Sequence, residues 1–201
     1  MALSRNKSDS WTCQFGYDIF GEKFRTLELS DFSDYLQTLS PSFGNNSIIG
    51  AFGDSHLRTY FCPEKEVYTT RHITAHIAYV SGASLIGFGR RDSSKGHFNK
   101  IKAYCRYIKP RFILLKFGQV DFEQGYYYRK MIKKEDINFT CFIEKLLSSY
   151  QEAINQLSNM TNIVVCALNP PTIQDPYEYA QTIKTIILEN IKDKDEKIIN
   201  I

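Results

Sequence analysis

Residues Ser47 to Thr59 read Ser-Ile-Ile-Gly-Ala-Phe-Gly-Asp-Ser-His-Leu-Arg-Thr, and this stretch decides the fold. A short apolar run ends in Gly53-Asp54-Ser55-His56, which is the pattern of a buried strand that passes into a helix. An α/β fold exposes a nucleophilic serine at such a turn, so Ser55 is the candidate nucleophile, with Asp54 beside it. The alternative is an ordinary turn in which Asp54 or Ser55 caps the following helix.

Two further apolar runs end in the same manner. One closes as Val80-Ser81-Gly82, and the other, which begins at Phe112, closes as Gly118-Gln119-Val120-Asp121. In a parallel sheet, ligands bind at the carboxyl ends of the strands. We therefore expect these two segments to lie near Ser55 and to form one site with it.

These blocks resemble those of the GDSL/SGNH hydrolase family, in the branch associated with glycans and capsules. In that family, Gly-Asp-Ser carries the nucleophile, a glycine follows the second strand, and Gly-x-Asn-Asp follows the third. Gly53-Asp54-Ser55 and Gly82 match the first two blocks, and the resemblance spans roughly Ile48 to Pro171.

The third and fourth blocks depart from the family. Gly118 and Asp121 match the glycine and the aspartate, but Val120 stands where the family has its oxyanion-binding asparagine, and Gln119 is one position away. No Asp-x-x-His follows, although the family takes its base and orienting acid from that block. For this reason we expect the 201 residues to be the N-terminal part of a longer polypeptide.

The resemblance implies a three-layer α/β/α sandwich with a mainly parallel sheet, of the SGNH-hydrolase or flavodoxin-like kind. It implies a serine esterase that needs no cofactor and acts on a small-molecule or glycan ester, in particular an O-acetyl group on a carbohydrate, through a Ser55 acyl-enzyme. The backbone N–H groups of Ser55 and Gly82 would bind the oxyanion. Two alternatives remain open. One is a catalytically impaired protein that binds a glycan or an acyl donor, and the other is a coenzyme A-dependent O-acyltransferase with Arg90, Arg91 and Lys116 as phosphate contacts.

A serine nucleophile needs a neighbouring imidazole as general base. His56 directly follows Ser55, so we expect its side chain to diverge from the hydroxyl and to serve as a substrate-side or structural group. His72, His76 and His97 are expected to be surface or packing histidines. Asp121 either orients a backbone amide or neighbouring side chain, or caps the segment after its strand.

Composition is that of one globular domain. Of the 201 residues 43% are hydrophobic and 23% charged, and the net charge of +3 comes from interspersed Lys, Arg, Asp and Glu, so nucleic acid is not an expected partner. No apolar run is long enough to span a membrane, and the N-terminus lacks a leader pattern, which favours a cytoplasmic protein. The five cysteines are an odd number at irregular spacing, so reduced thiols are expected and a metal site is not.

Alternating apolar runs predict four strands and the helices between them. The strands are expected at about 47–52, 76–80, from 112, and at 162–168, and the helices at 27–39 (capped at Ser30 or Ser33), after 55, at 94–107, 138–157 and 176–191. Residues 67–75 are expected to be a polar insert and 87–91 a loop. Residues 11–24 are expected to form a hairpin or strap, within an N-terminal extension (1–46) that packs on the α/β domain (47–201). Tyr126 to Tyr128 either stack on a flat ligand or form a partly buried junction.

Overall fold

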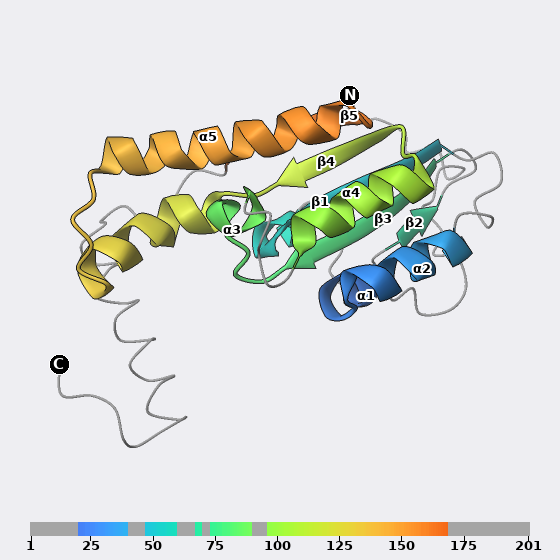
Figure 1. Ribbon diagram of the computed structural model, residues 1–201, viewed down its shortest axis with the longest axis horizontal. Coiled ribbons are helices and arrows are strands. Elements are labelled where there is room, and N and C mark those ends of the chain that lie inside the picture. The colour runs from blue at the N-terminus through green and yellow to red at the C-terminus, as the bar shows by residue number, and fades with distance from the viewer. Residues whose placement is uncertain (1–19, 40–46, 60–66, 70–72, 90–95, 169–201) are drawn as a thin grey trace, which may run out of the picture.

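A five-stranded sheet forms the centre of the protein. The computed structural model describes residues 20–39, 47–59, 67–69, 73–89 and 96–168. Strands β1 (Ser47–Asp54), β3 (Ile73–Val80), β4 (Phe112–Lys116) and β5 (Asn162–Val165) are parallel, and β2 (Val67–Thr69) pairs antiparallel with β3 (Figure 1). The order is β2-β3-β1-β4-β5. The predicted α/β sandwich with a mainly parallel sheet is confirmed.

The helices connect and flank these strands. The α-helices are α1 (Phe20–Thr26), α2 (Leu29–Leu39), α3 (Leu85–Gly89), α4 (His97–Ile108) and α5 (Phe139–Ser158). A 3-10 helix, η3 (Ser55–Thr59), follows β1 directly, and two π-helical turns, η4 (Asp121–Gly125) and η5 (Tyr128–Ile132), follow β4. Asn138 begins α5 by accepting a hydrogen bond of 2.8 Å from Thr140 N, as a side-chain cap does.

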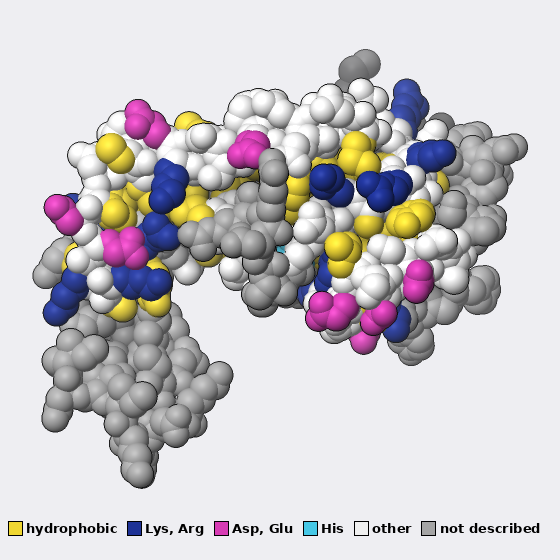
Figure 2. Space-filling model, in the orientation of Figure 1, with side chains coloured by type: hydrophobic (Ala, Val, Ile, Leu, Met, Phe, Trp, Pro, Cys, Tyr) yellow, Lys and Arg dark blue, Asp and Glu magenta, His cyan; other side chains and the backbone are white. Residues whose placement is uncertain are grey.

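The main core lies between one face of the sheet and helices α1, α2, α4 and α5. Alternation along β1 turns Phe52 to this face, where its ring contacts those of Phe24 at 5.3 Å and Tyr104 at 5.1 Å. Ala51 points to the other face and packs with Leu57 of η3 and Ile77 of β3 in a smaller cluster. The helix predicted at 176–191 lies outside the described residues. On the face drawn in Figure 2, basic, acidic and hydrophobic side chains all reach the surface.

Strand order places a topological switch point beside β1. The chain runs from β1 to β3 on one side and then, through α4, to β4 on the other side of β1. Such a reversal is a topological switch point, where the loops leave the sheet in opposite directions and open a ligand crevice at the carboxyl ends of the strands. In this chain the switch point lies between the ends of β1 and β4.

Two stretches predicted without regular structure are ordered elements. Within 67–75, the expected polar insert, the chain forms β2 and the first part of β3, because edge pairing recruits a short strand that has little apolar signal of its own. In 87–91, the expected loop, residues 87–89 belong to α3. There Phe88 is buried against Phe98 and Phe117, so tertiary packing overrides the low helix propensity of Gly87.

The N-terminal part and the end of β1 also differ from expectation. Residues 20–24, expected in a hairpin or strap, begin α1, and residues 11–19 lie outside the described part of the chain. Ser30 and Ser33 do not cap α2 but lie inside it, where Ser33 Oγ donates to Leu29 O. β1 continues through Asp54, so the strand ends two residues later than predicted.

Candidate functional site

Three adjacent strand ends bring the predicted site residues to one edge of the sheet. In the register, Asp54 of β1 lies opposite Val80 of β3, and Gly53 lies opposite Lys116 of β4. Ser55 follows β1 as the half-buried first residue of η3. Ser55 therefore directly follows the strand that lies between β3 and β4 in the sheet.

The two glycines after the neighbouring strands form turns that other residues rarely adopt. Gly82 has φ 69° in a turn closed by a hydrogen bond from Ala83 N to Val80 O, and Gly118 has φ 102°. Gly82 is exposed, and no described residue accepts a hydrogen bond from its N–H. This N–H is therefore available to a ligand.

Asp54 is fully buried, and its carboxylate turns back over the start of η3. Its Oδ1 accepts from the backbone N–H of His56 at 2.9 Å and lies 3.2 Å from His56 Nδ1. Among the described residues its Oδ2 has no hydrogen-bond partner. Asp54 thus contacts the His56 ring through one oxygen, and its other oxygen is buried without a hydrogen bond from the described part of the chain, which carries a free-energy cost.

The contacts of His56 continue into a chain of buried polar side chains. His56 Nε2 lies 3.9 Å from Glu123 Oε2, and Glu123 Oε1 accepts from Gln119 Nε2 at 2.6 Å. Gln119 Oε1 in turn accepts from Lys116 Nζ at 3.3 Å. We call Asp54, His56, Glu123, Gln119 and Lys116 the polar network. It joins the segments at the ends of β1 and β4.

Lys116 is the cation of the polar network. The side chain is fully buried, and its Nζ also donates to Ala167 O at 2.7 Å. Burial lowers the pKa of the Lys116 ammonium, and the Asp54 carboxylate acts in the opposite direction. The network therefore combines carboxylates and an ammonium in a site of low dielectric constant, where electrostatic interactions are strong.

Asp121 joins the segments that follow β3 and β4. Its Oδ2 accepts a hydrogen bond from Leu85 N, in the first turn of α3. Burial raises the pKa of the Asp121 carboxyl to about 6, and the bond from the Leu85 backbone opposes this shift. Asp121 thus contacts a backbone amide in the segment that begins at Gly82.

The sequence analysis did not single out Glu123, and it assigned Lys116 to phosphate binding rather than to the polar network. The spacing of Gln119 and Glu123 was a usable signal, because residues four apart share one helical face. Glu123 lies in η4, and π-helical turns are rare and recur at functional sites.

His76 and His97 contact residues other than Ser55. His76 is buried, with its Nδ1 2.9 Å from the Tyr104 hydroxyl, and desolvation lowers its pKa to about 4. His97 stacks on the Phe24 ring at 5.6 Å, and His72 lies outside the described residues. Among the described residues the Ser55 hydroxyl has no hydrogen-bond partner. The described part of the site therefore contains a candidate nucleophile without a base in contact.

The three consecutive tyrosines differ in environment. Tyr126 is buried, and its ring contacts Phe139 at 5.0 Å and Phe142 at 5.7 Å, whereas Tyr128 is exposed. Tyr126 therefore belongs to the core, and Tyr128 is the member of the three that is most open to a ligand.

Within the described ranges, no three or more His, Cys, Asp or Glu side chains are placed to hold a metal ion. Of the helices in this part of the chain, none has both the length and the apolar character needed to cross a membrane.

No protein-family model matches the sequence, and a comparison with curated proteins finds no significant relative. The fold and the site geometry therefore define an α/β protein with a network of polar side chains at its switch point.

Proposed function

We propose that this protein cleaves an ester through nucleophilic attack by Ser55. The observation that carries the proposal is the position of Ser55, which is half-buried directly after β1, the strand between β3 and β4, while a Gly82 N–H after β3 is used by no described group. Switch points of this kind are where open α/β sheets bind their ligands.

In the proposed reaction, Ser55 Oγ attacks the acyl carbon, the ester C–O bond breaks, and the proton of the Ser55 hydroxyl passes to the leaving alcohol. Water then attacks the acyl-enzyme, which releases the acid and returns a proton to Ser55 Oγ. The backbone N–H groups of Ser55 and Gly82 are the candidate donors for the oxyanion. Gln119 does not serve as the third donor in this conformation, because its side chain is fully buried and its amide nitrogen donates to Glu123. Loss of one such donor typically lowers turnover by about 100- to 1000-fold, so slow turnover is expected.

The substrate class rests on the resemblance to the glycan-associated GDSL/SGNH hydrolases. An O-acetyl group on a carbohydrate is the substrate that this resemblance favours, and fold alone does not decide it. The segment around Gly82 is exposed, so a large alcohol such as a glycan has room on that side of Ser55.

A non-catalytic binding protein is the second candidate. It is favoured by the environment of the described histidines, because His56 contacts two carboxylates and His76 lies in the core. The O-acyltransferase alternative loses one of its expected phosphate contacts, because Lys116 is fully buried and donates to Ala167 O. Arg90 and Arg91 lie outside the described residues.

Labelling with a fluorophosphonate, read by the intact mass of the full chain, tests the proposal. We expect one adduct on the wild type and none on Ser55→Ala. Ser81→Ala is the matched control, since Ser81 is an exposed serine at the neighbouring strand end, and it should label as the wild type does. An unlabelled wild type would favour the binding protein. An adduct that persists in Ser55→Ala would assign the nucleophile elsewhere.

Acetate release from an O-acetylated polysaccharide, lost in Ser55→Ala, then tests the substrate class.

A further inference from the structure

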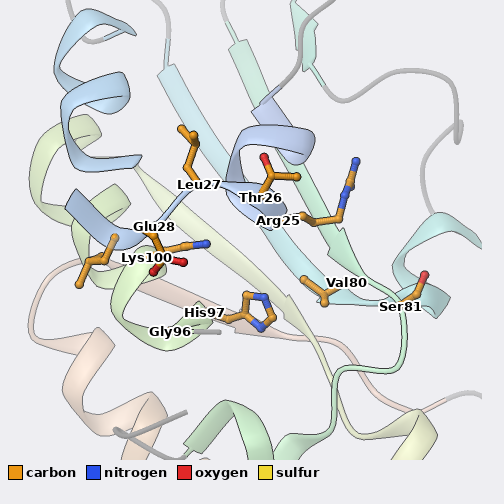
Figure 3. A pocket seen from close by; sticks show the side chains of 10 residues that line it. Arg25, Thr26, Leu27, Glu28, Val80, Ser81, Gly96, His97 and Lys100 are labelled. Atoms are coloured by element: carbon orange, nitrogen blue, oxygen red, sulfur yellow. The ribbon is translucent and has the colours of Figure 1, made fainter. Parts of the chain in front are cut away.

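A cavity of about 440 Å³ lies beside the end of β3, apart from the polar network. Its walls come from the α1–α2 junction, the residues that end and follow β3, and the start of α4 (Figure 3). None of the five polar-network residues lines it. Its size lies within the range of small-molecule sites.

Lys100 forms the buried wall of this cavity. The side chain is only 3% exposed, and its Nζ donates to Phe24 O at 2.8 Å. That carbonyl is its one hydrogen-bond acceptor among the described residues, whereas an ammonium carries three N–H donors. Burial lowers the pKa of Lys100, and the Glu28 carboxylate opposes this effect. A desolvated ammonium with donors to spare gains strongly from a second oxygen acceptor.

Arg25 brings a second cation from α1. Its Nη1 donates to Tyr79 O at 3.3 Å, and the guanidinium lies 5.0 Å from the centre of the Tyr79 ring. These contacts hold the planar group in place, and its five N–H donors match the geometry of a carboxylate or a phosphate.

Cations outnumber carboxylates among the described lining residues of the cavity. Of these residues Glu28 is the one carboxylate, and it is exposed, whereas Arg25 and Lys100 are cations. α4 also begins here, with Gly96 and His97 in the wall, and the N-terminal end of a helix favours negative charge. Figure 3 shows Arg25, Glu28, His97 and Lys100 around the same space.

We propose that this cavity binds a small ligand through an oxyanion, a carboxylate or a phosphate, held by Lys100 and Arg25. Ser81 also lines the cavity and directly precedes Gly82, so the ligand lies next to the strand end that faces Ser55. The proposal does not depend on the reactivity of Ser55. It adds an anion site to the protein whether or not the protein is an esterase.

Titration of the full chain with three sugars tests the proposal. The probes are glucuronate for a carboxylate, glucose 6-phosphate for a phosphate, and glucose as the neutral control. The readout is the NMR signal of the His97 ring, which lies in the cavity wall and is assigned with His97→Asn. We expect saturable shifts from at least one anionic sugar, with a dissociation constant on the order of 1 mM, and none from glucose.

Lys100→Met and Arg25→Gln should each weaken this binding by about tenfold or more, since each removes a charge-assisted hydrogen bond. Lys102→Met, which removes a charge from the same helix outside the cavity, and Ser55→Ala should bind as the wild type does. If Lys100→Met fails to fold, Arg25→Gln at the half-buried wall still decides the question. Equal shifts with glucose, no shift with either anion, or equal weakening by Lys102→Met would each overturn the proposal.

Discussion

At the scale of single residues, the buried carboxyl groups near Ser55 have distinct partners. Asp54 contacts His56, whereas Asp121 accepts from the backbone of Leu85 across the strand end. Ionising a buried carboxyl costs free energy unless hydrogen bonds or cations compensate it. For Asp121 the compensation is incomplete, because burial raises its pKa to about 6.

This pKa makes the stability of the protein depend on pH through Asp121. The ordinary pKa of an aspartate carboxyl is 3.8, so between pH 3.8 and about 6 the folded protein holds a proton that the unfolded chain has released. Below this window both forms hold the proton. The free energy of unfolding therefore falls as pH rises through the window, by about 3 kcal/mol, and stays lower above it.

Asp121→Asn removes this dependence and keeps an oxygen that accepts from Leu85 N. Relative to wild type, the variant should gain stability between about pH 4 and about pH 7, as measured by urea unfolding. His76 acts with the opposite sign, because its folded pKa near 4 lies below 6.5, but it is present in both proteins and cancels in the difference. The exposed control Asp136→Asn should show no such trend. A difference between Asp121→Asn and wild type that stays constant with pH would contradict the assignment.

At the scale of elements, the close approach of β4 to β1 explains why the residue at position 53, near the end of β1, is a glycine. A Cβ at Gly53 would collide with the backbone carbonyl of Lys116 and come within 3.1 Å of Leu57 Cβ. Gly53 is therefore required for the contact between the two strands. Gly82, by contrast, is required for its positive φ, and a Cβ there would meet no atom within 4 Å.

These two reasons predict different costs for the same substitution. Gly53→Ala should destabilise the protein by about 3 kcal/mol, because β4 must shift away from β1. Gly82→Ala should cost only about 1 kcal/mol, the strain of a left-handed conformation in an open turn. Chemical unfolding of both variants measures the two losses of stability. A larger loss of stability in Gly82→Ala than in Gly53→Ala would mean that β1 and β4 move apart at little cost.

At the scale of the whole molecule, α1 and α2 share the core of the sheet. Phe20 stacks on His76 of β3 at 4.9 Å, and Phe24 contacts Phe32 of α2 at 5.5 Å and Phe52 of β1 at 5.3 Å. One aromatic cluster thus joins residues before position 40 to the strands. A shared core of this kind favours one cooperative unfolding transition.

Phe24→Ala should accordingly destabilise the whole protein by about 3 to 5 kcal/mol, since it leaves a cavity in this cluster. Leu147→Ala, at a helix position that is 60% exposed, is the control and should change stability little. Far-UV and near-UV circular dichroism should follow one transition in each variant. Separate transitions in Phe24→Ala would instead make α1 and α2 a unit that unfolds by itself.

The fold was predictable wherever the local pattern was long or strongly apolar. α5, predicted at 138–157, spans Phe139–Ser158, and the strands with apolar runs appear in parallel order. The short elements α3 and β2 were not predictable, because packing and edge pairing stabilise them rather than their own sequence.

The sequence by itself determined that three strand ends carry Ser55, Gly82 and Gly118, because strand periodicity and glycine turns are local properties. Only the tertiary structure decided which side chains meet there. The polar network and the cavity at Lys100 arise from residues far apart in the chain, for example Lys100 and Phe24, which are 76 positions apart. Their burial and direction depend on how the strands and helices pack, and no local pattern contains that information.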